Sequence, residues 1–254
     1  MSAPTADLGR PPAGGAVFVT GTDTDAGKTV ITAALAAALR AAGAPITAAK
    51  ALATGSPPPG DDAERLGRAA GHPPRCARCL PTPASPARAA LLAGEDIDVT
   101  ALLAWCAALP RPALLEGVGG FEVPIAPTLR VSGLARALGW PVLVVAQNRL
   151  GAVNHSLLTA QAVQAQGLTL AGLVLVDPPG PPGPLQAWNA DDLAAALPCP
   201  VARAPRLPDP DDPAALAALG AALLAQLPAV TKGLSASTVE GPTPRARTRA
   251  STSA

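Results

Sequence analysis

The chain has 254 residues and a mass of 25.0 kDa, near the size where one hydrophobic core stops growing, so a single domain is expected. A hydrophobic fraction of 49% excludes disorder throughout, and a formal net charge of +1 supplies no field to attract nucleic acid or an anionic membrane. No apolar run reaches the roughly 18 residues of a membrane span. Four cysteines in so long a chain favour the reducing cytoplasm over a disulfide scaffold.

Short apolar runs alternate with longer helical patterns along the chain. The first run predicts a buried strand over 16–20, which a glycine-containing loop joins to a helix over 28–42. Further predicted strands are 46–50, 113–116, 141–147, 171–177 and 200–204, and further predicted helices are 61–70, 97–109, 155–166 and 214–226. This alternation predicts a doubly wound α/β domain, with a mainly parallel sheet flanked by helices.

The domain is expected over 16–228, between a flexible extension at 1–15 and a disordered tail at 229–254 that is rich in Ser, Thr, Pro and Arg. Residues 71–88 receive no predicted element. They include Cys76 and Cys79, but a structural zinc site needs four ligands, and Cys106 and Cys199 lie in apolar segments. Even with His72 as a third ligand, these cysteines are better interpreted as spare thiols in a loop.

Lysine is rare in this chain, which has 16 arginines and only Lys28, Lys50 and Lys232. The two lysines of the predicted domain are therefore candidates for sites that need a compact point charge, although chance is the alternative. Both adjoin the carboxyl ends of predicted strands, where open α/β sheets bind their ligands. Glu116 and Asp177 end two further predicted strands.

Residues 21–29 (GTDTDAGKT) have the features of a phosphate-binding loop between a strand and a helix. Glycines let backbone N–H groups point at phosphate oxygens, and the helix adds its positive end. Lys28 is placed to reach the terminal phosphates, and the Thr29 hydroxyl to ligate Mg²⁺. Five residues separate Gly21 from Gly27, one more than in the common loop.

Glu116 follows a buried run and precedes glycines that would admit a ligand, which suits a magnesium ligand near the phosphates. The alternative is an ordinary strand end at the surface. Asp61 and Asp62 offer a further carboxylate, but they could equally cap the helix that begins there.

Five motifs resemble those of dethiobiotin synthetases, in the same order and across residues 16–210: GTDTDAGKT at 21–29, KALATG at 50–55, GDDA at 60–63, LLEGVGG at 114–120 and LGAVNH at 150–155. The resemblance implies a homodimeric ligase of biotin biosynthesis that uses ATP and Mg²⁺. CO₂ adds to an amine of 7,8-diaminononanoate, ATP phosphorylates the carbamate, and the second amine closes the ureido ring.

The resemblance assigns catalysis to Lys50 and Lys28, and Mg²⁺ ligation to Thr29, Asp62 and Glu116. The nucleotide-binding positions that it implies are Asp25, Ala26, Gly27, Lys28, Thr29, Val30, Asp62, Glu116, Gly117, Val118, Gly119, Val176, Asp177, Pro205, Arg206 and Leu207. The substrate-binding positions that it implies are Thr24, Lys50, Thr54, Gly151, Ala152, Val153 and Asn154, the last four serving the pocket of the partner subunit. N–H groups near the start of the predicted helix there could hold the substrate carboxylate, whereas His155 could equally be a packing or capping residue.

Three departures from the family pattern stand out. Val176 occupies the place of an asparagine that reads adenine, which leaves the choice of nucleoside triphosphate open. Ala87 replaces the histidine of a Ser-Pro-His motif. The chain has no tyrosine, so Trp188 is the candidate to replace a tyrosine contact.

Two other functions share the phosphate-binding loop. Partitioning or assembly ATPases of the related deviant type usually carry an extra lysine early in the loop, where this chain has Thr22 and Asp23. A paralogue that binds nucleotide without catalysis is the other alternative.

Overall fold

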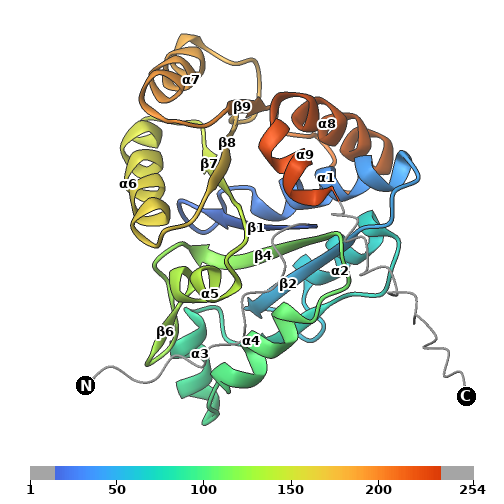
Figure 1. Cartoon of the computed structure of the whole chain (residues 1–254), viewed down its shortest axis with the longest axis vertical. Coiled ribbons are helices and arrows are strands. Elements are labelled where there is room, and N and C mark those ends of the chain that lie inside the picture. The colour runs from blue at the N-terminus through green and yellow to red at the C-terminus, as the bar shows by residue number, and fades with distance from the viewer. Residues whose placement is uncertain (1–14, 236–254) are drawn as a thin grey trace, which may run out of the picture.

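Runs of Val, Leu, Phe and Ala form a central sheet in the computed structural model, which describes residues 15–235 (Figure 1). The strands lie in the order β3-β2-β4-β1-β7-β8-β9, and every pair of neighbours is parallel. Their bounds are β1 Ala16–Gly21, β2 Thr47–Thr54, β3 Cys76–Leu80, β4 Ala113–Gly120, β7 Val142–Gln147, β8 Leu170–Val176 and β9 Val201–Ala204. The α/β fold expected from the sequence is therefore confirmed.

Helices cover both faces of this sheet (Figure 1). The layer on one face is α1 Lys28–Ala41, α2 Asp61–Ala70, α8 Pro213–Gln226 and α9 Pro228–Leu234. The layer on the other face is α4 Val99–Ala107, α5 Val131–Leu138, α6 Ala152–Ala165 and α7 Pro184–Ala196. The remaining elements are α3 Pro86–Ala93, which packs on β2 and β3, and a small antiparallel pair, β5 Pro124–Ala126 and β6 Leu129–Arg130.

Alternation along β1 divides the core between the two layers. Phe18 belongs to the cluster beneath α5 and α6, whereas Val17 and Val19 belong to the cluster beneath α1 and α8. Small side chains let α1 and α8 approach closely, since a Cβ atom added at Gly220 would lie only 1.9 Å from the carbonyl oxygen of Ala34. An interior poor in aromatic residues is thus packed by bringing backbones together.

The strand order places the loop after β1 at the middle of the sheet, with β4 on one side and β7 on the other. The strands β2 and β4 are neighbours, and Lys50 pairs in register with Glu116. Both strands extend four residues beyond their predicted ends, so the prediction that these two residues end their strands is wrong. Both residues lie inside their strands, so the candidate site begins deeper in the sheet than expected.

Several elements differ from the sequence-based expectation. Residues 76–80, interpreted as loop, form the edge strand β3, and α6 begins at Ala152 instead of residue 155. The predicted tail boundary at residue 229 is also wrong, because Val230 and Leu234 of α9 are buried in the core. Residues 1–14 and 236–254, to which the flexible extension and most of the predicted tail belong, lie outside the described residues.

Between residues 15 and 235, no single helix is long and apolar enough to cross a membrane. The helices α8 and α9 reach that length only as a pair, which is bent by 104° at the break between them.

Candidate active site

The loop between β1 and α1 wraps tightly around the start of the helix. Gly27 caps α1 with a φ of +95°, and Asp25 also has a positive φ, of +58°. The side-chain amide of Gln147 donates to the Asp25 carbonyl at 2.8 Å, which ties the loop to the end of β7. Among residues 15–235, no side chain caps the N-terminus of α1. Its first N–H groups and the helix dipole therefore remain available to an anion.

Lys28, the first residue of α1, has a buried side chain whose Nζ donates to the Asp23 carbonyl at 2.8 Å. The hydrogen bond folds the lysine back along the loop that it follows. Burial lowers the pKa of Lys28 below its usual value of 10.5, and the positive charge of Lys50 acts in the same direction. Glu116, Asp62 and Asp23 partly oppose the shift.

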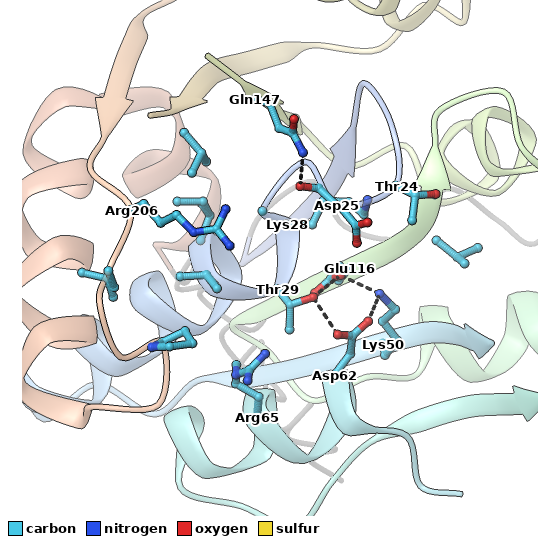
Figure 2. Close-up of a pocket in the computed structure, with 18 of the residues that line it drawn as sticks. Thr24, Asp25, Lys28, Thr29, Lys50, Asp62, Arg65, Glu116, Gln147 and Arg206 are labelled. Carbon is cyan, nitrogen blue, oxygen red and sulfur yellow. Dashed lines mark hydrogen bonds and ion pairs between the residues drawn. The ribbon is translucent and has the colours of Figure 1, made fainter. Parts of the chain in front are cut away.

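A second cluster joins four elements of the fold (Figure 2). The Lys50 Nζ of β2 lies 2.6 Å from Glu116 Oε1 of β4 and 2.6 Å from Asp62 Oδ2 of α2. The Thr29 hydroxyl of α1 is within hydrogen-bond distance of the same two carboxylates, at 2.9 Å from Glu116 Oε1 and 3.0 Å from Asp62 Oδ1. Residues from positions 29 to 116 of the sequence thus meet at one point.

The charges of this cluster stabilise one another. Burial disfavours the Lys50 ammonium group, but Glu116 and Asp62 outweigh that effect and raise its pKa. Burial likewise opposes the charge of Asp62, but Lys50 and the Thr29 hydroxyl lower its pKa. Lys50 therefore stays protonated, and Asp62 stays ionised, across the neutral range.

The oxygen atoms of Thr29, Asp62 and Glu116 suit a hard divalent cation such as Mg²⁺. Glu116 is fully buried, and its Oε2 has no hydrogen-bond partner among the described residues. A buried carboxylate oxygen without a partner is costly unless something binds to it. Within residues 15–235 there is no group of three His, Cys, Asp or Glu side chains that could hold a metal ion, so the threonine hydroxyl has to complete this set.

The phosphate-binding loop with Lys28 and the Lys50 cluster both open into one cavity of about 1060 Å³. This volume exceeds that of a typical pocket for one small ligand. Lys28 and Lys50 both line it, and Arg206 points toward it from the side opposite Lys50 (Figure 2). The proposed site residues that line it are Thr24, Asp25, Gly27, Lys28, Thr29, Val30, Lys50, Thr54, Asp62, Glu116, Val118, Gly119, Val176, Asp177, Pro205, Arg206 and Leu207. The structure thus brings together most of the residues that the sequence singled out.

Six of the expected site residues do not line this cavity: Ala26, Gly117, Gly151, Ala152, Val153 and Asn154. Gly151 caps α6, and the three residues after it form the first turn of that helix. The prediction that Trp188 replaces a tyrosine contact is wrong for this chain's cavity, because Trp188 lies on α7, is 61% exposed and does not line it. Within the described part of the chain, none of the residues that line the cavity is aromatic.

A buried polar network at the end of β7 was missed by the sequence analysis. Asn148 is 1% exposed, and its Nδ2 donates to Asp177 Oδ1 at 2.7 Å. Arg203 Nη2 donates to Asp177 Oδ2 at 2.7 Å, and Asn189 Nδ2 donates to Asn148 Oδ1 at 2.9 Å. The sequence carried a signal for Asn148, because it is a polar residue that follows a buried apolar run. Its partners Asp177 and Asn189, which are 29 and 41 positions further along the chain, gave no signal of this contact.

Arg65, which also lines the cavity, is a second residue that the sequence did not single out. It belongs to the amphipathic helix α2, where an arginine on a polar face is unremarkable. Ser85 and Pro86 line the cavity as well, at the start of α3.

Cys76 and Cys79 lie three residues apart on β3, so their side chains leave opposite faces of the sheet. Cys76 Sγ contacts the Arg78 carbonyl, and Cys79 Sγ contacts the Ser56 carbonyl. Burial raises the pKa of the Cys76 thiol to about 11, which keeps it protonated near neutral pH. The strand geometry therefore does not favour a shared metal ion at this pair.

Comparison with known proteins agrees with this geometry. A family model described as an AAA domain matches residues 15–229. The ATP-dependent dethiobiotin synthetase BioD of Mycobacterium avium (strain 104) is 40% identical over 188 residues, which cover 72% of this chain and 83% of that protein. The protein of the same name from Ralstonia nicotianae is 43% identical over 169 residues, which cover 62% of this chain and 74% of the relative.

Proposed function

The chain belongs to the ATP-dependent dethiobiotin synthetase family and is a ligase, and on this premise we propose that it closes the ureido ring of 7,8-diaminononanoate with CO₂. The co-substrate is ATP, and the products are dethiobiotin, ADP and phosphate. The observation that carries the proposal is the convergence of Lys28 and Lys50 on one cavity with Thr29, Asp62 and Glu116.

The reaction balances in three steps. One amine of the diamine attacks CO₂ and loses a proton, which gives a carbamate. A carbamate oxygen attacks the γ-phosphorus of ATP, the bond to the β-phosphate oxygen breaks, and ADP leaves. The second amine then attacks the carbonyl carbon of the mixed anhydride and loses a proton, the bond to the phosphate oxygen breaks, and phosphate leaves with the ring closed.

The chain contributes positioning and charge to these steps, as is usual for phosphoryl transfer. Lys28 and the N-terminus of α1 hold the β- and γ-phosphates. As ADP leaves, negative charge grows on its β-phosphate. Lys50 directs its ammonium group at the carbamate and the transferred phosphoryl group. Its 3% exposure places that charge in a poorly solvated region, where it acts more strongly than in water.

Thr29, Asp62 and Glu116 would hold Mg²⁺, which would supply positive charge to the phosphate oxygens when bound. The charged form of Asp62, which Lys50 and Thr29 favour, is the form that binds a cation.

We assign the first turn of α6 to the substrate pocket of a partner subunit in a homodimer. Residues 151–154 do not line this chain's own cavity, and Leu150 beside them is 81% exposed. Leu158, two turns further along α6, is 57% exposed. An apolar surface next to helix N–H groups suits a contact that buries the leucines and presents the helix N-terminus to a carboxylate.

Phosphate release by the purified protein tests the proposal. Release should require the diamine, bicarbonate, Mg²⁺ and nucleotide together, and mass spectrometry should find dethiobiotin in equal amount. Hydrolysis that ignores the diamine, or no coupled turnover with ATP, CTP or GTP, would overturn the proposed function.

A further inference from the structure

The loop at residues 205–212 joins β9 to α8 and forms one wall of the cavity. Its lining residues are Pro205, Arg206, Leu207, Pro208 and Pro210. Three of these are prolines without an N–H group, so this wall has few backbone donors with which to fix itself. Side-chain contacts with another element are therefore needed to hold this wall in place.

Asp211 connects this loop to α2 through three charged hydrogen bonds. Arg65 donates through Nε to Oδ1 at 2.9 Å and through Nη2 to Oδ2 at 3.0 Å, which is a bidentate pair. Arg68, one turn further along α2, donates through Nη2 to Oδ1 at 2.8 Å. Asp211 Oδ1 therefore accepts from both arginines, and the two arginines lower the pKa of this carboxyl group.

In residues 15–235, the hydrogen bonds and ion pairs that reach from positions 205–211 to another element are those of Asp211. The other bonds of the segment are internal, such as that from the Asp211 N–H to Asp209 Oδ1. Leu207 adds apolar contact with the core, where it is partly buried. Asp211 thus provides the polar contacts that attach the 205–212 loop to α2.

The helix at the other end of this attachment also belongs to the Lys50 cluster. Asp62, in the first turn of α2, lies three residues before Arg65, so both project from neighbouring positions of the helix. Arg65 itself lines the cavity. A displacement of the loop from α2 would open the cavity beside the cluster that contains Lys50, Asp62 and Thr29.

We infer that Asp211 is a positioning residue, which holds the 205–212 loop against α2 and keeps the nucleotide side of the cavity in its binding shape. The inference rests on the proposed nucleotide site. Its role concerns affinity for the nucleotide and not the chemistry, because Asp211 does not line the cavity.

Loss of this attachment should leave the fold intact. The first turn of α8 is capped by Asp212, whose carboxylate accepts from the N–H groups of Ala214 and Ala215. Exposed ion pairs also contribute little to global stability. The loop would instead have to be ordered each time that nucleotide binds, which weakens binding.

The test compares Asp211→Asn with Asp192→Asn, which alters an exposed aspartate on α7. Asp211→Asn should raise the KM for ATP, and the dissociation constant of a non-hydrolysable ATP analogue in calorimetry, by about tenfold. The kcat, the KM for the diamine and the melting temperature should match those of the control. Asp211→Glu should recover part of the affinity, because it restores the charge.

Unchanged nucleotide affinity in Asp211→Asn, with normal diamine-dependent turnover, would overturn the inference and leave the proposed function standing. Equal losses for both substrates together with a lower melting temperature would show a general structural role and would also overturn it. Failure of the unaltered protein to bind any nucleotide would overturn both the inference and the proposed function.

Discussion

Lys50 and Glu116 occupy directly paired positions on adjacent parallel strands, and their side chains meet at 2.6 Å between Nζ and Oε1. Neighbouring residues in register project from the same face of a sheet at the same level. The backbone pairing of β2 and β4 therefore fixes this ion pair, although the two residues are 66 positions apart.

Replacement of Lys50 should abolish ring closure. The ammonium group fits between two carboxylates in a fully buried position, and a planar guanidinium group has neither its size nor its geometry. We expect Lys50→Arg to lower kcat by at least about 10²-fold, with an unchanged circular dichroism spectrum. Lys232→Arg, at an exposed position of α9, is the matched control. Unchanged turnover in Lys50→Arg would contradict the role assigned to this residue.

Glu116→Gln should weaken the response to Mg²⁺. The substitution removes the buried negative charge and replaces one proposed metal-binding carboxylate with a neutral amide. The Mg²⁺ concentration that gives half-maximal phosphate release should rise by about tenfold or more. Glu122→Gln, which alters an exposed glutamate paired with Arg130, should leave it unchanged. A normal magnesium titration for Glu116→Gln would count against this site.

Activity should fall at a lower alkaline pH than the loss of a proton from an ordinary lysine would cause. Burial lowers the pKa of Lys28, so this group loses its proton, and with it the attraction for phosphates, at a pH below its usual pKa of 10.5. The kcat/KM for ATP reports groups of the free enzyme, and it should begin to decline at a pH below 10.5. Lys28→Arg should lower the plateau and move that decline to higher pH. An identical alkaline limb in both proteins would assign it to another group.

The chain should discriminate poorly between nucleobases. Val176 ends β8 and packs against the loop, since a Cβ atom at Gly27 would lie 3.0 Å from Val176 Cγ2. The nearby Asn148 and Asp177 already use their polar atoms on each other and on Arg203. We expect the kcat/KM values for ATP, GTP and CTP to agree within about tenfold.

Val176→Asn should increase the preference for ATP, because an amide at this position can pair with the edge of a base. Val176→Ala is the control that removes packing without adding a polar group. Strong discrimination by the unaltered protein would show that other groups read the base.

Gly220→Ala should destabilise the fold. The added methyl group would collide with the Ala34 carbonyl where α8 crosses α1, and neither backbone can withdraw without moving a helix. Such overpacking costs about 1–3 kcal/mol or more, measured by urea denaturation. Gly133→Ala on α5 is the control, because its methyl group would meet only the flexible end of Leu129, at 3.0 Å. Equal stability of the two variants would contradict this view of the α1–α8 contact.

The parts of the fold that local sequence determines were predictable. The phosphate-binding loop depends on residues next to one another, and α1 is rich in Ala and Leu, which favour a helix. The convergence of Lys50 and Glu116 was predictable in part, because a parallel sheet aligns its strands, although both residues lie inside β2 and β4 and not at the strand ends.

Features that depend on distant partners were not predictable. The residues of β2 (TAAKALAT) include weak strand formers, and they are extended because the strand lies between β3 and β4. Helix α9 is short and contains a glycine, and its packing is visible only once Val230 and Leu234 reach the core. The contact of Arg65 with Asp211 spans 146 positions, and no spacing rule anticipates it.

No aromatic side chain from residues 15–235 lines the cavity, and this has a spectroscopic consequence. The chain has no tyrosine, so its ultraviolet emission comes from its three tryptophans: Trp140 is buried beneath Arg111, Trp105 on α4 is partly buried, and Trp188 is open to solvent. None of the three lines the cavity, so the natural emission should respond little to nucleotide binding. The substitution Leu207→Trp would place a tryptophan in the cavity lining, and its emission would then respond to nucleotide binding.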